Sequence, residues 1–220
     1  MTRRLQIICS YIPKGKTFAD VGCDHGYCAK YALDNGLCEV AYITDISKAS
    51  LQKAETLLKG EIAAGKCIPV CCDGLSGLDC VPDCVLIAGM GGEEIIHILS
   101  DLPLPEKFVL QPMKNADKVR AFLIGRGAKI STDHTFYDGK YYDLIVGDGA
   151  GGDTYSDWEI AFGRDNLKNP SPDFANRMEH DREECIKLLQ NTSLSRESRE
   201  EILDRKKRTE AILNAITPDI

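Results

Sequence analysis

Short hydrophobic runs alternate with amphipathic segments along most of the chain. The runs predict buried strands at residues 17–22, 40–46, 67–75, 84–92 and 107–113. Apolar residues at helical spacing predict a helix that opens at Thr2 and further helices at residues 27–36, 47–65, 93–102 and 115–127. Because strands that alternate with helices form a parallel sheet with right-handed crossovers, the pattern predicts a doubly wound α/β domain.

The alternation ends in a different signal at residues 128–150. Two β-rich runs flank Asp138 and Gly139, a pair typical of a tight hairpin turn. A hairpin inserts an antiparallel strand into the sheet, which a plain dinucleotide-binding fold does not require. The expected sheet therefore has seven strands, mostly parallel, with a terminal antiparallel hairpin.

The pattern changes again after Gly152. Residues 156–174 are predicted to be a connection, in which Ser171 and Pro172 form the N-cap and first turn of a helix. Two amphipathic helices with heavily charged outer faces follow, one on each side of residues 191–195. Two such helices around a short turn predict an antiparallel, coiled-coil-like hairpin. We therefore expect one domain at residues 1–153 and a helical one at residues 154–220.

Composition narrows the class of protein. The net charge of −7 argues against indiscriminate nucleic-acid binding but is compatible with a local basic surface. No segment approaches the roughly 20 apolar residues that span a bilayer, and the N-terminus lacks a secretory pattern, so we expect a cytoplasmic protein with no membrane contact. The ten cysteines include the adjacent Cys71 and Cys72 but no CxxC pair. We interpret them as small buried residues in a reducing compartment and expect no metal site.

Polar residues and glycines gather where the predicted parallel strands end. In such sheets, ligands lie beyond the carboxyl ends of the strands. Each residue taken alone has a structural alternative, since a glycine can simply turn a corner and Asp45 can simply cap a helix. Their joint placement predicts a cofactor site made of Asp20, Gly22, Cys23, Asp24, His25, Gly26, Asp45, Ile46, Asp73, Gly74 and Gly89.

The carboxylates of this set discriminate between cofactors. Asp45 lies about 23 residues beyond Gly22, the usual place for a carboxylate that binds ribose hydroxyls in both NAD and S-adenosylmethionine enzymes. A pyrophosphate requires free backbone N–H groups, and the Asp24 carboxylate would repel it. S-adenosylmethionine instead carries a sulfonium and an ammonium, which Asp20 and Asp24 complement. The sequence therefore favours S-adenosylmethionine, with Asp73 and Gly74 placed at the adenine edge by analogy of fold.

Several segments together resemble the bacterial tRNA (adenine-22-N1)-methyltransferases. They are "ADVGCDHGYC", "ITDIS", "CDGL", "LIAGMGG", "LQPM", "DGKYYDLIV" and, at the domain junction, "FGRDNLKNPSPDF". The resemblance implies a Rossmann-like class I methyltransferase domain with a C-terminal α-helical domain, S-adenosylmethionine as methyl donor and N1 of adenine 22 in tRNA as acceptor. The sequence departs from the family pattern at Cys23, Gly26, Cys28 and Ala29, and Met113 stands where the family often has asparagine.

This resemblance suggests which residues take part in the reaction. Adenine N1 carries its own lone pair, so no base is needed before attack, and the acceptor base has to be unpaired because N1 lies on its Watson–Crick edge. The expected catalytic residues are Asp24, Gly89, Met90 and Gly91. Asp24 or the backbone carbonyls of residues 89–92 would accept the N6 hydrogens, and Met90 or Tyr27 would pack on the base. For His25, contact with the methionine carboxylate or the base and capping of local backbone groups both remain open.

Candidate tRNA contacts are the densest basic clusters of the chain. The expected substrate-binding residues are Arg3, Arg4, Tyr27, Gln111, Arg205, Lys206, Lys207 and Arg208. The charged runs have an alternative interpretation as solvated helix faces. Two other functions stay open: a class I methyltransferase acting on another RNA, a protein or a small molecule, and a non-catalytic module that senses S-adenosylmethionine or binds RNA. The sequence leaves the oligomeric state open between a monomer and a weak dimer.

Overall fold

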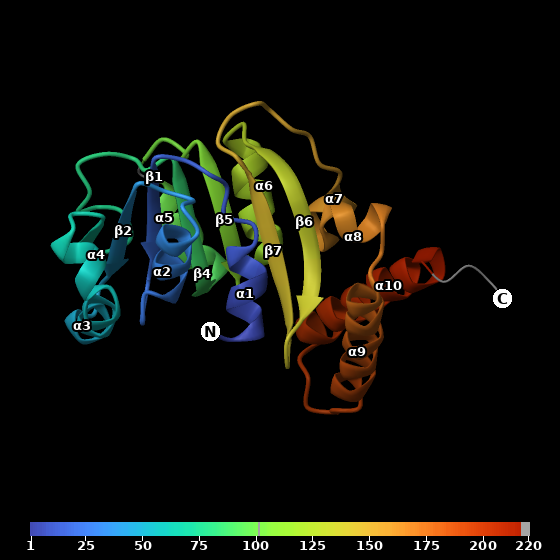
Figure 1. Cartoon of the computed structure of the whole chain (residues 1–220). Coiled ribbons are helices and arrows are strands. Elements are labelled where there is room, and N and C mark those ends of the chain that lie inside the picture. The colour runs from blue at the N-terminus through green and yellow to red at the C-terminus, as the bar shows by residue number, and fades with distance from the viewer. Residues whose placement is uncertain (101, 217–220) are drawn as a thin grey trace.

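A single seven-stranded sheet organises the protein in the computed structural model, which describes residues 1–100 and 102–216 (Figure 1). Its strands are β1 (Thr17–Val21), β2 (Val40–Asp45), β3 (Cys67–Cys71), β4 (Cys84–Met90), β5 (Lys107–Pro112), β6 (Lys129–Tyr137) and β7 (Tyr141–Asp148). The spatial order is β3-β2-β1-β4-β5-β7-β6, and β7 runs in the opposite direction to the other six strands. The predicted parallel sheet and its terminal hairpin are therefore confirmed.

Helices cover both faces of the sheet. They are α1 (Arg3–Cys9), α2 (Tyr27–Asp34), α3 (Lys48–Leu57) and α4 (Lys59–Ala63) on one face, and α5 (Gly92–Ser100) and α6 (Ala116–Gly125) on the other. Successive strand residues point to opposite faces, so Phe18 packs under the first group and Ala19 under the second. Because both faces are buried, the strands read as continuous hydrophobic runs in the sequence.

Two predicted elements differ from the structure. The single helix predicted at residues 47–65 is two helices, because the backbone of the fully buried Leu58 leaves the helical region between α3 and α4. The predicted connection at residues 156–174 contains two short helices that the sequence did not predict, α7 (Asp157–Phe162) and α8 (Arg164–Lys168). A capping box between Ser156 and Glu159 starts α7, and Gly163 separates the two helices.

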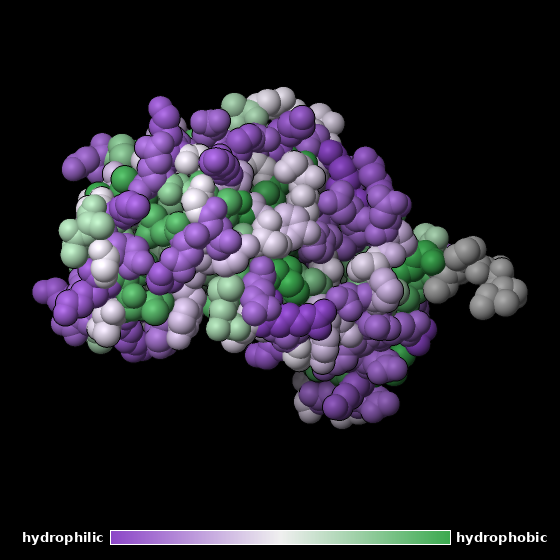
Figure 2. Space-filling model, in the orientation of Figure 1, coloured by the Kyte–Doolittle hydropathy of each residue, from purple (hydrophilic) through white to green (hydrophobic). Residues whose placement is uncertain are grey.

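The C-terminal hairpin consists of α9 (Pro172–Leu189) and α10 (Arg196–Ile216). Ser171 is the N-cap of α9, as predicted, and Phe174, Met178, Ile212 and Leu213 form a small separate core. The hairpin lies beside the carboxyl ends of the parallel strands, at the lower right of Figure 1. Hydrophilic side chains dominate its visible surface, with small hydrophobic areas (Figure 2). The end of the predicted helical domain, residues 217–220, lies outside the described residues, and the boundary at residue 153 stays a prediction.

The segment after the sheet also caps the free edge of β6. Unpaired N–H groups on an edge strand invite association with other chains, and a cover of side chains removes that hazard. Three alternate residues in the second half of β6 donate their N–H groups to polar side chains of the two segments that follow, residues 164–168 and 172–189. The donor–acceptor pairs are Asp133 N to Asp165 at 2.8 Å, Thr135 N to Asn166 at 2.9 Å and Tyr137 N to Asp173 at 2.9 Å.

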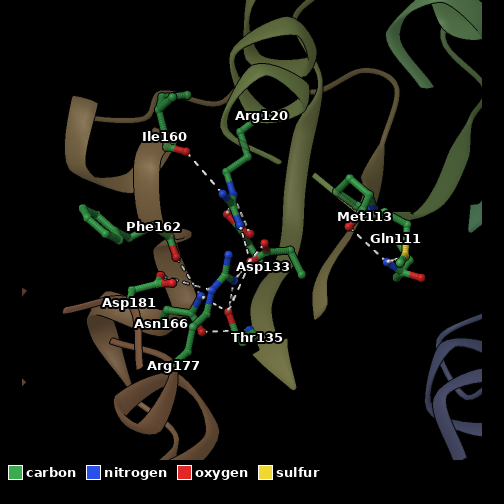
Figure 3. A network of polar contacts seen from close by, with 12 residues as sticks. Gln111, Met113, Arg120, Asp133, Thr135, Ile160, Phe162, Asn166, Arg177 and Asp181 are labelled. Carbon is green, nitrogen blue, oxygen red and sulfur yellow. Dashed lines mark hydrogen bonds and ion pairs between the residues drawn. The ribbon is translucent and has the colours of Figure 1, made fainter. Parts of the chain in front are cut away.

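A buried ionic network joins α6, the terminal hairpin of the sheet and α9 (Figure 3). Arg120, whose side chain is only 1% exposed, donates from Nε to both oxygens of Asp133 at 2.8 and 3.0 Å and from Nη2 to Asp143 at 3.2 Å. Arg177 on α9 approaches the same Asp143 carboxylate at 2.9 Å. Burial alone would raise the pKa of Asp143, but the guanidinium groups of Arg177 and Arg120 hold it below its ordinary value.

The cysteines take no part in disulfides, and all ten are free thiols. The interpretation as small buried residues is confirmed for seven of them, whereas Cys71 and Cys80 are exposed and Cys72 is partly exposed. Across residues 1–100 and 102–216, no helix combines the length and apolar character needed to cross a membrane.

Candidate functional site

The loop after β1 forms the centre of the site. Gly22 and Cys23 donate their N–H groups to the Thr44 carbonyl at 2.8 and 3.0 Å, which ties this loop to the end of β2. Asp24 follows with a φ of +46°, an uncommon backbone conformation for a residue with a side chain. The loop therefore presents its side chains and backbone at the carboxyl edge of the sheet, as the sequence predicted.

Asp20 is the buried carboxylate of this site. Only 3% of the residue is exposed, and its Oδ2 accepts the N–H of Ala29 at 3.0 Å. Burial raises the pKa of Asp20 to about 7, although the hydrogen bond from Ala29 opposes the rise. The carboxyl group is therefore divided between its neutral and ionised forms near neutral pH, and a cation bound beside it would favour the ionised form.

Asp24 lies at the rim of the site with partners of its own. Its carboxylate is 2.7 Å from His25 Nδ1 and 3.4 Å from Lys53 Nζ, and 60% of the side chain is exposed. Slight burial opposes the effect, but the hydrogen bonds from His25 and Lys53 lower the pKa of Asp24. The His25 ring in turn stacks on Tyr27 with 5.6 Å between ring centroids. The negative charge expected to complement a cation is thus partly balanced by Lys53, a partner that the sequence did not reveal.

Asp45 combines the two roles that the sequence left open. One carboxylate oxygen accepts the N–H of Ser47 at 2.8 Å, and Ser47 is the N-cap of α3. The other accepts the N–H of Asp24 at 3.3 Å. The same side chain lines a cavity of about 240 Å³ together with Ile46, Asp73 and Gly74. Asp45 therefore holds the local backbone and also faces the space where a ligand would lie.

Two cavities adjoin at this edge of the sheet. The first, which we call the nucleoside cavity, is the 240 Å³ space at the ends of β2 and β3. The second, which we call the α1 cavity, has a volume of about 450 Å³. Its lining includes Arg4, Asp20, Gly22, Cys23, Asp24, His25, Tyr27, Gly89 and Met90. Of the predicted cofactor residues, only Gly26 lines neither cavity.

The glycine-rich segment after β4 brings two turns close together. The pairing of β4 with β5 shifts register between Ala88 and Met90, and Gly89 there has a φ of +85°. A Cβ at Gly92 would lie 2.5 Å from the Asn115 carbonyl oxygen, so no side chain fits at that position. The segment therefore lies directly against the turn after β5. Its residues Ala88, Gly89 and Met90 line the α1 cavity.

Arg4 and Gln111 occupy positions that the sequence did not predict. Arg4 lies inside the α1 cavity, where its Nη1 donates to Gln111 Oε1 at 2.8 Å and its guanidinium lies 5.5 Å from the centre of the Tyr142 ring. Gln111 is fully buried behind it. Arg3 is exposed and does not line the α1 cavity, whereas Gln111 contacts Arg4 without lining the cavity itself.

The basic cluster of α10, residues 205–208, contains two residues in ion pairs, one exposed lysine and one arginine beside an aromatic ring. Arg205 contacts Asp181 at 2.8 Å and Lys206 contacts Glu210 at 2.6 Å, as expected for a solvated helix face. Lys207 is exposed, and the Arg208 guanidinium lies 5.6 Å from the ring centre of Trp158. These residues do not line the two cavities at the strand ends.

A larger cavity lies between the sheet domain and the helical hairpin. Its volume is about 670 Å³, and Lys114 lines it from one side while Arg205 and Arg208 line it from α10. Lys114 also packs beside the glycine-rich segment after β4, since a Cβ at Gly91 would lie 3.2 Å from Lys114 Cε. Lys114 was not among the residues predicted from the sequence, although it directly follows the predicted strand end "QPM".

Comparison with known proteins agrees with this geometry. Residues 1–145 match a family model described as a methyltransferase domain. A Mycoplasma pneumoniae protein assigned as a tRNA methyltransferase is 35% identical over 149 residues, which cover 66% of this chain and 70% of the relative. The tRNA (adenine(22)-N(1))-methyltransferase of Bacillus subtilis is 32% identical over 155 residues, covering 66% of this chain and 64% of the relative.

A solved structure extends the likeness in fold to the C-terminal helices. The structure of M. capricolum TrmK with S-adenosyl-homocysteine has a TM-score of 0.89 at 22% identity and covers 99% of both chains. The chain therefore belongs to the methyltransferase-domain family and, within it, to the tRNA methyltransferases.

Proposed function

We propose that the protein transfers a methyl group from S-adenosylmethionine to N1 of adenine 22 in tRNA. The observation that carries this proposal is the pair of adjoining cavities at the carboxyl edge of the sheet, with Asp20 in one and Asp45 in the other. The Bacillus subtilis relative is named for this reaction, and the M. capricolum structure contains the cofactor product.

The two cavities suit the two halves of the cofactor. In the nucleoside cavity, Asp45 would accept hydrogen bonds from the ribose hydroxyls, and Asp73 and Gly74 lie where the adenine edge would bind. In the α1 cavity, the buried Asp20 would bind the amino-acid ammonium as a carboxylate. S-adenosylmethionine supplies an electrophilic methyl group on a sulfonium, so the protein has only to position the acceptor.

Positioning is the main catalytic task that the residues of this chain can perform. Holding donor and acceptor in line and excluding water removes much of the barrier to such a displacement. The carbonyls of Met90 and Gly91 already accept the N–H groups of Met113 and Ile95, so the Gly89 carbonyl is the better candidate for the N6 hydrogens of the base. We propose that Tyr27, which is 41% exposed and stacked on His25, packs against the acceptor base.

We further propose that tRNA extends from the methyl-transfer site toward the helical hairpin. The hairpin and the strand ends lie at the same end of the molecule (Figure 1). Lys114 lies between the strand ends and the hairpin, because it packs beside Gly91 and lines the same cavity as Arg208. Within the described residues, Lys114 forms no ion pair at 4.0 Å or less, although its charge contributes to lowering the pKa of Glu93 after the larger effect of Lys118. Its exposed ammonium could therefore contact a phosphate. Such a substrate also favours a cytoplasmic protein.

Methylation of defined transcripts tests the reaction. The protein would be incubated with labelled S-adenosylmethionine and unmodified tRNA transcripts that carry adenine or guanine at position 22. We expect label in 1-methyladenosine at position 22 of the first transcript and none in the second. Equal labelling of both transcripts would contradict the proposed position, and no labelling of any transcript would favour a protein or small-molecule acceptor.

Replacing Lys114 with alanine is expected to raise the KM for tRNA about fivefold, since an exposed ion pair contributes up to about 1 kcal/mol. The slope of log affinity against log salt should fall by about 1, because one phosphate contact is lost. The matched control is Lys118→Ala, which removes a lysine already 2.6 Å from Glu93. Equal effects of the two substitutions on KM and on the salt slope would show that Lys114 has no particular role.

The pKa of Asp20 predicts a pH dependence of cofactor binding. Burial raises this pKa to about 7, and binding of an ammonium requires the ionised form. Affinity for S-adenosylmethionine should therefore decrease below about pH 7, by up to about tenfold per pH unit. Because the folded pKa is raised above its unfolded value, ionisation of Asp20 also makes the empty protein less stable as pH rises from about 4 through 7.

Calorimetry at pH 6, 7 and 8, in buffers of different ionisation enthalpy, measures both the affinity and the proton released on binding. Asp20→Asn should bind more weakly at pH 8 and should lose this pH dependence. If the asparagine variant kept the same dependence, another group such as His25 would be its source.

A further inference from the structure

The side chain of Met90 lies between the two cavities of the cofactor site. Gly22 and Met90 are the residues that line both cavities. A Cβ built on Gly22 would lie only 2.1 Å from Met90 Cε and 3.8 Å from its sulfur. The thioether end of Met90 thus packs directly against the bare backbone of Gly22, where it separates the nucleoside cavity from the α1 cavity.

The backbone of Met90 is fixed while its side chain is adaptable. The Met90 carbonyl accepts the N–H of Met113 at 2.8 Å, and the preceding register shift sets where the strand ends. The side chain is partly buried against the apolar cluster of α5 and α6. Methionine is unbranched, has three rotatable bonds and fills irregular spaces, so this side chain can move without a change in the backbone.

A ligand that occupies both cavities has to pass between Gly22 and Met90, where the contact leaves no room for a chain of atoms. We propose that Met90 is a displaceable plug. Its thioether occupies the centre of the cofactor site in the empty enzyme and moves away from Gly22 when a ligand that spans both cavities binds. This inference rests on the proposed function, because S-adenosylmethionine has a nucleoside half and an amino-acid half joined at sulfur.

The plug makes the site selective for ligand length. A nucleoside alone fits the cavity of Asp45 and Asp73 and leaves Met90 in place, whereas the full cofactor has to displace it. If the displaced conformer makes up about 10% of the empty enzyme, the apparent affinity for the full cofactor is reduced about tenfold relative to an open site. The reduction appears in the association rate, because only the open fraction accepts the ligand.

Association kinetics of two ligands on three proteins test this proposal. The ligands are S-adenosylhomocysteine, which spans both cavities, and adenosine, which fits one. For Met90→Ala we expect S-adenosylhomocysteine to associate about tenfold faster than with the wild type. The association rate of adenosine should change far less, because adenosine does not have to pass between Gly22 and Met90. A circular-dichroism spectrum and thermal midpoint like those of the wild type show that the variant is folded. The matched control is Met113→Ala, since Met113 lies near Arg4 but is 44% exposed and lines neither cavity.

The outcomes separate this inference from the proposed function. Equal acceleration of both ligands in Met90→Ala, or no acceleration of S-adenosylhomocysteine, would overturn the plug while leaving the cofactor site intact. A wild-type protein that binds adenosine but not S-adenosylhomocysteine would overturn the proposed function as well.

Discussion

Replacing Asp143 with alanine is expected to lower the free energy of unfolding by about 3–5 kcal/mol, the usual effect of removing one partner from a buried ion pair. Asp143 is 7% exposed and accepts hydrogen bonds from Arg120, Arg177 and the Thr135 hydroxyl. Without its carboxylate, Arg177 loses its closest charged partner at 2.9 Å. Arg120, which is almost fully buried, keeps Asp133 as its charged partner and its hydrogen bond to the Ile160 carbonyl.

Urea denaturation of full-length proteins measures this effect. The matched control is Glu200→Ala, which breaks the pair with Arg196 at 2.8 Å on side chains that are 63% and 93% exposed. An exposed pair contributes about 0–1 kcal/mol, so the control should unfold near the wild-type midpoint. A loss below 1 kcal/mol for Asp143→Ala would mean that solvent reaches the network. Because α9 supplies Arg177, weakened docking of the hairpin should accompany the loss of stability.

Local patterns in the sequence accounted for most of the fold. The strands lie on continuous hydrophobic runs because the sheet is covered on both faces, and Asp138 and Gly139 mark the hairpin turn. Ser47 and Ser171 were identifiable as N-caps because capping depends on neighbouring residues alone. The gathering of the predicted cofactor residues at one edge of the sheet also followed from topology, since the strand ends of a parallel sheet meet there.

Long-range polar pairing could not be predicted in the same way. In the sequence, Asp143 is one polar residue at the edge of a hydrophobic run, whereas its partners Arg120 and Arg177 lie 23 and 34 positions away. The cover of β6 by α8 could not be predicted for the same reason. In the sequence, Asp165 and Asn166 resemble ordinary loop residues, and their role depends on where the edge strand β6 lies in the folded protein. Side-chain direction was equally inaccessible: Arg4 and Met90 were singled out, but the sequence does not show that one points into the α1 cavity and the other against Gly22.

Replacing Asp45 with alanine is expected to weaken S-adenosylmethionine binding by about 1.5–3 kcal/mol, or roughly 10- to 150-fold in Kd, because the ribose hydroxyls lose an ionised acceptor. The same carboxylate also accepts the N–H groups of Ser47 and Asp24, so part of the effect could come from loosening of the loop. Asp45→Asn separates the two contributions, since its amide oxygen still accepts hydrogen bonds but carries no charge.

A control with similar backbone contacts is available at the opposite edge of the sheet. Asp83 accepts the N–H groups of Lys16 and Thr17, both at 2.9 Å, and lines neither cavity of the cofactor site. Asp83→Ala should therefore lower the thermal midpoint without changing cofactor affinity, as measured by calorimetry. Asp45→Ala should weaken cofactor binding strongly even if it lowers the thermal midpoint no more than Asp83→Ala does. If both variants bound S-adenosylmethionine with wild-type affinity while remaining folded, Asp45 would serve only to hold the backbone of Asp24 and Ser47, and the ribose would have to be held by other residues of the cavity such as Ile46 and Asp73.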